Sequence, residues 1–327
     1  MTRFPVVIAV DVGGTTISAG TVTPTGEIVS ARQRGTHDDP GRAEAAIEAL
    51  IDELRREGEG NGFEARGIGV GVPGPVDTVS GVISELVPHV PELGGRPLAS
   101  VLAARFRLPA FVDNDVNALA LGEWMFGAGR GASSLVLLAP GTGFGTGIVI
   151  DGRLVRGAHG FGGELGHVPV KFDGPPCWCG GRGCLALYAS GRGIADAARA
   201  RVAAAPDAAL LRAAGGDVAA ITAPLVFRLA AAGDPLAAAL VDEACQALGA
   251  LIGIVVNGLN PEVIVITGGV AAAFVPLEKR LLRAAADYAF ARALAQTRVT
   301  ITPADKAETM RGAAALVLYE MERTGAS

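Results

Sequence analysis

The sequence predicts an α/β protein built from two similar domains, and three observations support this. Stretches typical of buried strands alternate with stretches typical of helices, which is the pattern of layered α/β folds. A plan of strand, glycine-rich turn, strand, short turn and strand occurs at residues 6–33 and again at residues 134–156. The chain has 327 residues, more than one core commonly holds. Each domain is therefore expected to open with a three-stranded antiparallel unit.

Helices and strands are predicted to alternate between and after the two repeats. The expected elements before the second repeat are a helix at residues 41–57, a buried strand at 67–74, a helix at 97–106, a strand at 109–115 and a helix at 116–127. The expected elements after it are an Ala-rich helical region at residues 190–258, a buried strand at 262–270 and a last helix at 306–323.

Composition and charge narrow the class of protein. Hydrophobic residues make up 50% of the chain and charged residues 19%, which is typical of a globular protein. The net charge is −5 and the basic residues are scattered, so we expect no binding to nucleic acid. The 46 glycines suggest many tight turns or backbone held close to a ligand.

No membrane or export segment is expected. The most apolar stretch, residues 247–270, is interrupted by Asn257, Asn260, Pro261 and Glu262, which favours helix, turn and strand over a membrane span. The apolar run in "MTRFPVVIAVDVGG" is too short for a secretory signal and lacks a cleavage site. We therefore expect a cytoplasmic protein, in which clustered cysteines are metal ligands or catalytic groups more often than disulfides.

Three of the four cysteines fall within the short segment "HVPVKFDGPPCWCGGRGC". Cys177, Cys179 and Cys184, with His167 ten residues upstream, match a closed tetrahedral Zn²⁺ site of the Cys₃His kind, which has no open position for water. Such a site is structural. The alternatives are three unrelated thiols or a redox centre, and C-x-C is not the usual dithiol spacing. Cys245, alone in a predicted helix, is expected to be a core residue.

Two glycine-rich turns, "DVGGTT" and "PGTGFGTG", are candidate phosphate-binding loops. Each exposes several backbone N–H groups between two strands, and glycine lets a phosphate approach without a Cβ in the way. Either one alone is more often a plain turn. Two similar turns that open two similar halves favour the functional interpretation, because facing hairpins form the floor of an interdomain cleft.

The segment "FVDNDVNA" places two carboxylates, Asp113 and Asp115, at the end of a predicted buried strand. A carboxylate in that position suits a general base, and Asn114 between them suits a hydroxyl ligand. The alternative is that these residues cap the following helix, a role open to Asp115. The residues by themselves do not decide between these two interpretations.

Taken together, the motifs resemble the ROK family (repressor, open reading frame, kinase) of the actin-like, hexokinase-type, ribonuclease H-like fold. The matching stretches are "DVGGT", "GVPGPVD", "DNDVNALALGE", "GTGFGTG", "ELGH", "CWCGGRGCLALYASG" and "VITGGV". The resemblance implies an ATP-dependent, glucokinase-like kinase with an interdomain cleft and a sugar hydroxyl as phosphate acceptor. It also implies a smaller domain of residues 1–117 plus 304–327 and a larger domain of residues 118–303 with the zinc loop.

The resemblance assigns roles to individual residues. It implies Asp115 as the general base, Asp11 as a water-mediated Mg²⁺ ligand, and Asp113 as a structural residue. The implied substrate ligands are Gly74, His89, Asn114, Asp115, Glu164 and His167, the last of which binds zinc through its other nitrogen. The implied ATP-binding residues are Asp11, Gly13, Gly14, Thr15, Thr16, Gly141, Thr142, Gly143, Gly145, Gly268 and Gly269.

Three departures from the family pattern are found. Ala186 replaces a glutamate that holds hydroxyls near the anomeric end of the sugar, "VPHVPELGGRP" places His89 near a usual asparagine and glycine in place of tryptophan, and Thr16 replaces a lysine. The first two predict a non-glucose hexose or a cyclitol as acceptor, or else a weakened glucokinase. The family also includes DNA-binding repressors, for which we expect no room before residue 11, although a non-catalytic sugar-binding regulator stays open. A homodimer or homotetramer is implied.

Overall fold

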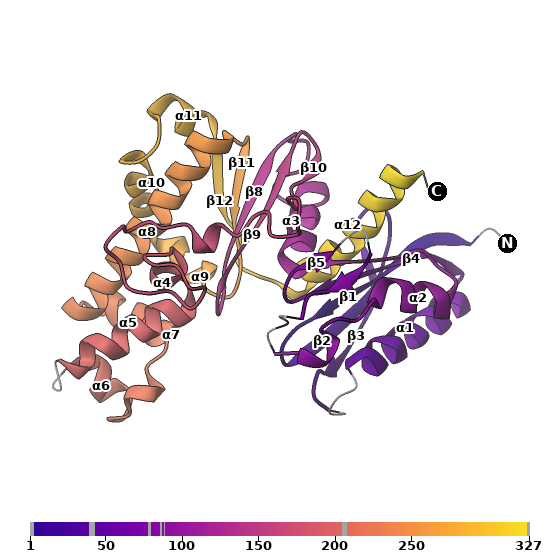
Figure 1. Cartoon of the computed structure of the whole chain (residues 1–327), viewed down its shortest axis with the longest axis horizontal. Coiled ribbons are helices and arrows are strands. Elements are labelled where there is room, and N and C mark those ends of the chain that lie inside the picture. The colour runs from indigo at the N-terminus through magenta and orange to yellow at the C-terminus, as the bar shows by residue number, and fades with distance from the viewer. Residues whose placement is uncertain are drawn as a thin grey trace. The chain divides into compact units, whose positions relative to one another are not determined.

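The computed structural model describes residues 3–38, 43–77, 80–85, 87, 89–204 and 208–325. Its internal contacts divide the chain into two compact units, whose elements are labelled in Figure 1. Unit 1 comprises Met1–Ser133, Gly147–Gly162 and Asp305–Ser327, and unit 2 comprises Ser134–Thr146 and Gly163–Ala304. The domain boundaries implied by the resemblance stay a prediction.

Unit 1 is built on a five-stranded sheet in the order β3-β2-β1-β4-β7. Its strands are β1 (Phe4–Val12), β2 (Thr16–Val22), β3 (Ile28–Gly35), β4 (Phe63–Val72) and β7 (Ala110–Asn114). Strand β2 is antiparallel to both β1 and β3, whereas β4 is parallel to both β1 and β7. The predicted antiparallel opening of this unit is confirmed. A small pair, β5 (Val76–Asp77) and β6 (Val82–Ile83), follows β4.

Helices cover both faces of this sheet. Successive residues of a strand point to opposite sides, so the continuous apolar run of β1 supplies core residues to both faces. On one face, Val7 and Ala9 of β1 pack against α12 (Lys306–Thr324), drawn in yellow in Figure 1. On the other face, Ile8 and Val10 share a core with helices α1 (Ala43–Gly60) and α2 (Leu98–Phe106). The helix predicted to start at residue 41 is described from Ala43 on; its first two residues lie outside the described ranges.

Several glycines of unit 1 permit close packing rather than a turn. A Cβ at Gly69 of β4 would clash with the carbonyl oxygen of Ala313 on α12. Where α12 passes α3 (Asp115–Met125), a Cβ on Gly122 would lie 2.8 Å from the Cα of Gly312. The glycine excess is therefore due in part to helices lying close to strands and to each other, a cause that the sequence pattern does not reveal.

The second sheet has the order β10-β9-β8-β11-β12. Its strands are β8 (Leu135–Pro140), β9 (Phe144–Ile150), β10 (Arg153–Leu154), β11 (Val263–Ile266) and β12 (Arg298–Ile301). Strand β11 is parallel to both β8 and β12, and β10 is antiparallel to β9. When the strands of each sheet are numbered along the chain, both sheets have the order third, second, first, fourth and fifth. This similarity agrees with the two similar domains that the sequence repeat predicts. Strand β12 was not predicted, because its four residues are only half buried or exposed.

The helical region of unit 2 is more broken than the sequence predicted. Its helices are α4 (Ala186–Ala189), α5 (Gly191–Ala203), α6 (Ala209–Ala213), α7 (Ala223–Ala231), α8 (Pro235–Leu259), α9 (Ala271–Phe274), α10 (Glu278–Ala286) and α11 (Ala291–Gln296). Gly215, Gly216 and Gly233 have positive φ and lie between the helices of residues 190–258, so left-handed turns interrupt the expected run.

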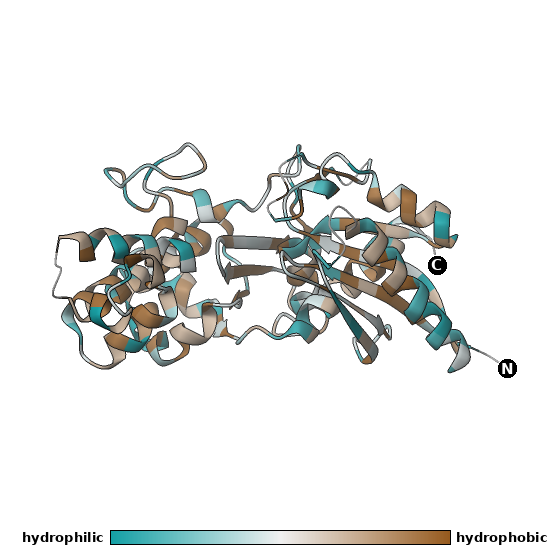
Figure 2. Cartoon of the chain, turned by 90° about the horizontal axis from the view of Figure 1, so that it is seen from below, coloured by the Kyte–Doolittle hydropathy of each residue, from teal (hydrophilic) through white to brown (hydrophobic). Residues whose placement is uncertain are grey.

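Helix α8 is long and apolar enough to cross a membrane by length and composition alone. However, 72% of its most apolar window is buried inside the structure, where it packs against α7 and α10. Figure 2 shows hydrophobic and hydrophilic residues mixed along the helices of both units. Helix α8 is therefore a core helix, and the turn at Asn260 before β11 agrees with the predicted helix, turn and strand.

Candidate active site

Three parallel strands of unit 1 end at the same edge of the sheet and bring three aspartates there. Asp11 of β1 pairs in register with Gly71 of β4, and Gly71 pairs with Asp113 of β7. Asp115 follows at the first residue of α3. A Cβ on Gly71 would lie only 3.4 Å from the Cα of Asp115, so the missing side chain lets the start of α3 lie over β4.

Asp115 has a strongly shifted acidity. Its pKa is raised to about 7, mainly by burial and in smaller part by the nearby carboxylate of Asp11, while the backbone N–H of Val116, which donates at 2.9 Å, acts in the opposite direction. Burial also raises the pKa of Asp11, and this rise is opposed by a hydrogen bond from Thr309 and by the charge of Lys306. A carboxylate that titrates near neutral pH suits general-base chemistry.

The N-cap of α3 is Asn114, so the alternative interpretation, in which Asp115 caps this helix, does not hold. The side-chain oxygen of Asn114 accepts hydrogen bonds from the backbone N–H groups of Val116 at 2.9 Å and Asn117 at 3.2 Å. Its amide nitrogen donates to the carbonyl oxygen of Gly74 at 3.2 Å. The cap therefore leaves Asp115 within the first turn and places Asn114, Asp115 and Gly74 together.

Asp113 is held in a buried ion-pair network. Its carboxylate accepts from Arg156 Nε at 2.7 Å and from Asn117 Nδ2 at 3.0 Å. Arg156 also donates to Glu320 at 2.6 Å. These contacts occupy the carboxylate of Asp113 and agree with the structural role implied for it. Arg156 was missed in the sequence, because no spacing links residue 156 to residues 113 and 320.

The first glycine turn is a tight loop between β1 and β2. The N–H of Gly13 donates to the carbonyl oxygen of Thr16 at 3.0 Å, and the hydroxyl of Thr36 donates to the carbonyl oxygen of Gly13 at 2.7 Å. A Cβ on Gly14 would lie 2.9 Å from the Cβ of His89, so this histidine lies against the turn. His89 has a φ of 68°, which is uncommon for a non-glycine residue and is often found at functional sites. Thr15 is exposed.

The second glycine turn lies in unit 2, at the end of β8. Its carbonyl oxygens at Gly141 and Thr142 accept hydrogen bonds from the N–H groups of Gly191, at 2.8 Å, and Arg192, at 3.1 Å, in the first turn of α5. Gly268, with a φ of 116°, lies against the carbonyl of Pro140.

The backbone of this turn has open space beside it. A Cβ on Gly141, Gly143 or Gly269 would meet nothing within 4 Å, which leaves room for a ligand beside the backbone. Gly145 lies just beyond, within β9. Unit 2 therefore brings the glycine turn at residues 141–145 and the pair Gly268 and Gly269 together with the start of α5. The roles of Gly191 and Arg192 there were not anticipated, although Gly191 is part of the "YASG" motif.

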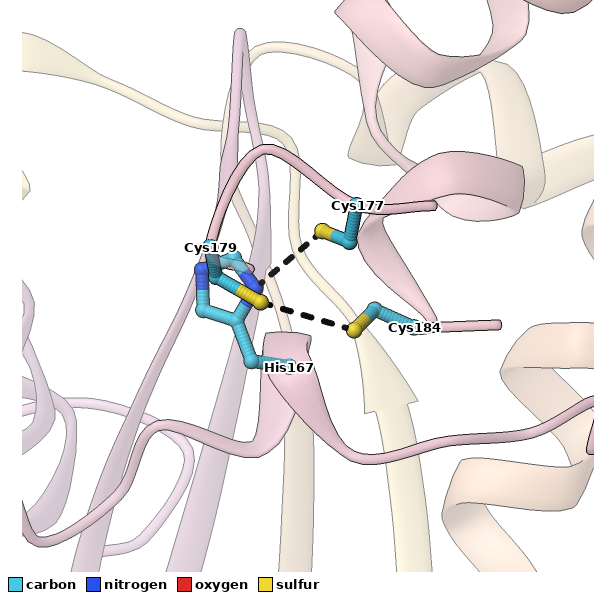
Figure 3. Close-up of side chains that lie close together, drawn as sticks. All are labelled: His167, Cys177, Cys179 and Cys184. Atoms are coloured by element: carbon cyan, nitrogen blue, oxygen red, sulfur yellow. Dashed lines mark hydrogen bonds between the residues drawn. The ribbon is translucent and has the colours of Figure 1, made fainter. Parts of the chain in front are cut away.

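A second cluster in unit 2 has the geometry of a metal site. Figure 3 shows His167 and the three cysteines converging on a common centre. Their ligand atoms all lie within 4.8 Å of one another. Two edges of this group, Cys179 Sγ to Cys184 Sγ and Cys177 Sγ to His167 Nδ1, are each 3.7 Å. Ligands at tetrahedral Zn²⁺ are separated by about 3.6–3.8 Å, so the four side chains fit that ion.

Glu164 and His167 are positioned by one short 3-10 helix, η2 (Leu165–His167). Glu164 is its N-cap residue, and its carbonyl oxygen accepts from the N–H of His167 at 3.0 Å. Residues three apart in a 3-10 helix lie on the same face. Because Nδ1 of His167 faces Cys177, its Nε2 is left for another partner.

The departures from the family pattern also have defined places. Ala186 is 1% exposed at the start of α4 and offers no polar group at the position where the resemblance implies a glutamate. Thr16 is the first residue of β2 and adds no charge to the first glycine turn. Cys245 is buried in α8, where burial raises the pKa of its thiol to about 11, as fits an inert core residue.

Comparison with known proteins identifies the family. A sequence model of the ROK family matches residues 7–320. A glucokinase from Thermotoga maritima is 34% identical over 314 residues, which is 95% of this chain and 96% of that protein. A solved ROK hexokinase from Thermus thermophilus has a TM-score of 0.82 and 32% identity, and the match covers 97% of this chain and 99% of that one.

A second solved structure is a ROK family glucokinase from Streptomyces griseus in complex with glucose and AMPPNP. It has a TM-score of 0.75 and 30% identity, and the match covers 95% of this chain and 98% of that one. With the two repeated sheets, these likenesses confirm the predicted α/β fold of two actin-like bodies. The chain belongs to the ROK family.

Proposed function

We propose that this protein is an ATP-dependent kinase that phosphorylates a hydroxyl of a sugar or sugar-like polyol, with Asp115 as the general base. The observation that carries the proposal is the position of Asp115, half-buried at the edge where three parallel strands end, with a pKa of about 7. Such a group can take a proton from a hydroxyl at neutral pH and give it up again after turnover. The glucokinase and hexokinase relatives act on the same class of acceptor.

The proposed reaction divides into a proton transfer and a phosphoryl transfer. As the acceptor oxygen forms a bond to the terminal phosphorus of ATP, the bond to the ADP oxygen breaks and the hydroxyl proton moves to Asp115. ADP leaves with the electron pair of the broken bond. Asn114 holds the acceptor beside Asp115, and Gly74 and His89 complete the contacts within unit 1.

The nucleotide is proposed to bind through backbone groups. In unit 1 these are at Gly13, Gly14, Thr15 and Thr16, with Asp11 holding Mg²⁺ through water. In unit 2 they are at Gly141, Thr142, Gly143, Gly145, Gly268 and Gly269, where the backbone is open to a ligand. Mg²⁺ supplies positive charge to the transferring phosphoryl group.

The metal cluster is proposed to hold structural Zn²⁺ through the three cysteine thiolates and Nδ1 of His167. Its function would be to fix the imidazole so that Nε2 faces an acceptor hydroxyl, with Glu164 on the same face of η2 contacting a second hydroxyl. The short distances within the cluster support this assignment.

The acceptor is proposed to be a non-glucose hexose or a cyclitol, because a buried alanine at position 186 removes the carboxylate that the family places near the anomeric end. The alternative is an ordinary glucokinase with weakened sugar contacts. We further propose a cytoplasmic homodimer or homotetramer without nucleic-acid or membrane partners. Light scattering on the purified protein measures the assembly.

A coupled assay of ADP release tests the function. We expect turnover with at least one member of a panel of hexoses, amino sugars and cyclitols. The Asp115→Asn variant should lose about 10²–10⁴-fold in kcat with little change in KM, since only the proton acceptor is removed. Asp52→Asn, an exposed change on α1, is the matched control. Sugar binding without ADP release would instead indicate a non-catalytic regulator.

A further inference from the structure

Within unit 2, a side-chain contact joins the metal loop, the segment that carries Cys177, Cys179 and Cys184, to the first turn of α5, which is hydrogen-bonded to the second glycine turn. The guanidinium of Arg192 lies over the indole ring of Trp178, 4.6 Å from the ring centroid, a distance typical of a cation–π pair. Trp178 stands between two of the cluster cysteines, and its ring also meets His167 edge-on, with the centroids 6.2 Å apart. The indole is therefore positioned by the metal loop.

The backbone of Arg192 is also held in place, at the start of α5. It is the second residue of α5, and its backbone N–H donates to the carbonyl oxygen of Thr142 in the glycine turn at 3.1 Å. Ser190 caps this helix by accepting from the N–H of Gly193 at 3.0 Å. The backbone of Arg192 is thus hydrogen-bonded to the turn, while its side chain remains 56% exposed.

The second glycine turn has no cationic side chain of its own. The stretch "PGTGFGTG" contains neither lysine nor arginine, although the backbone at Gly141 and Gly143 is open to a ligand. A guanidinium whose carbon lies over an aromatic ring can still donate through its N–H groups to other partners. One of them is 3.5 Å from Asp196, one turn further along α5, which leaves the rest for an anionic group.

We propose that Arg192 binds a phosphate group of the nucleotide, and that Trp178 is a positioning residue that holds the guanidinium for it. This inference deepens the proposed kinase function and rests on it. It gives the metal cluster a second consequence: by fixing Trp178, the cluster sets the affinity of the protein for nucleotide as well as the orientation of His167. Arginine suits this position because it both stacks on indole and donates two parallel hydrogen bonds to phosphate.

The binding of ADP to the metal-loaded protein tests this proposal. Calorimetry should give an ADP affinity about tenfold to a hundredfold weaker for Arg192→Met, since a charge-assisted contact to phosphate is lost. Trp178→Leu should weaken binding by only about twofold to fivefold, because the guanidinium stays but loses its platform. In the double variant the effect of Trp178→Leu should disappear, because it acts through Arg192. Metal content, measured in parallel, should stay at the wild-type level in Arg192→Met.

Fluorescence supplies a readout that a purely structural stack would not change. The chain has two tryptophans, so in a Trp124→Phe background the emission comes from Trp178 alone. ADP should alter this emission, and Arg192→Met should abolish the change. Arg105→Met removes a comparable exposed arginine over Phe106, at 5.4 Å, and should leave ADP affinity as in the wild type.

The possible failures are distinguishable. If the wild type binds ADP and Arg192→Met binds it equally well, the role of Arg192 is overturned while the kinase function stands. If the two variants weaken ADP binding only in proportion to a loss of metal, the stack stabilises the loop and the proposal is likewise overturned. If the wild type binds no ADP at all, both the proposal and the kinase function are overturned.

Discussion

The carboxylate of Asp11 lies close enough to Asp115 to raise its pKa, adding to the larger effect of burial, so that Asp115 titrates at about 7. Asp11 lies in β1, Asp115 directly follows β7, and β4 lies between these two strands in the sheet. Gly71 of β4 carries no side chain between them. Strand order and one glycine therefore bring the two carboxylates close together, and this adds to the larger effect of burial on the pKa of the proposed base.

The pH dependence of turnover follows from this pKa. A general base must be ionised before it accepts a proton, so kcat/KM for the acceptor should rise tenfold per pH unit below about 7 and level off above it. Rates measured from pH 5 to 9 at saturating MgATP test this. A profile that is flat down to pH 5 would show that the base has an ordinary carboxyl pKa, and it would argue against Asp115.

The stability of the protein should depend on pH through the same group. Because the pKa of Asp115 is raised on folding, its contribution is fully present below about pH 4 and is lost as the pH rises through about 7. Asp115→Asn should therefore be as stable as the wild type at low pH and more stable above pH 7, by a few kcal/mol at about 1.4 kcal/mol per pH unit. Urea unfolding at pH 4 and pH 8 measures the difference. Equal stabilities at pH 8 would contradict the shifted pKa.

The ion-pair network of Asp113 should matter for stability rather than for chemistry. Arg156→Met leaves a carboxylate that is 2% exposed without its main partner, which should cost about 3–5 kcal/mol. Adding Asp113→Asn should recover much of that loss, because the unpaired charge is removed. Denaturant unfolding checks both variants, with the exposed Arg153→Met as control. Should Arg156→Met unfold like the wild type, the network does not stabilise the fold.

Much of the fold could be predicted because local patterns determine it. The alternation of strand and helix patterns along the chain and the repeated glycine turns are enough to indicate two similar sheets. The patterns failed where local sequence carries little information. Strand β12 is half buried or exposed, and the helical region from α5 to α8 is broken at glycines with positive φ.

The candidate site divides in the same way. The metal ligands lie within eighteen consecutive residues, so their spacing alone predicts the cluster that the structure brings together. The choice between Asp113 and Asp115 depends on Arg156 and Glu320, which are 43 and 207 residues from Asp113 along the chain. The stack of Arg192 on Trp178 depends on how the metal loop lies against the start of α5 in unit 2. Such long-range pairings have no signal in a single sequence.

Removal of the metal should destabilise unit 2. We expect about one Zn²⁺ per chain, released by a strong chelator with a fall in thermal midpoint, because the loop carrying the ligands has few buried apolar residues. Cys184→Ser should lose the metal, while Cys245→Ala, in the core of α8, should retain it. Elemental analysis and a colorimetric zinc assay measure the content. A protein that contains no zinc and is as stable in chelator would refute the assignment.

The buried alanine at position 186 should determine the choice of acceptor. Ala186→Glu introduces a carboxylate at the start of α4, where the resemblance implies a glutamate that holds hydroxyls near the anomeric end of the sugar. If the absence of this carboxylate excludes glucose, the variant should raise kcat/KM for glucose at least about tenfold, because a buried hydroxyl of glucose gains a partner. It should lower kcat/KM for the preferred cyclitol or hexose, because a hydroxyl of that acceptor loses its partner. Ala186→Met, of similar length but uncharged, should not produce this exchange. Rates on both acceptors, with thermal midpoints to confirm folding, test the prediction. A wild type that already prefers glucose, with no gain in Ala186→Glu, would assign the specificity to other contacts and favour the ordinary glucokinase.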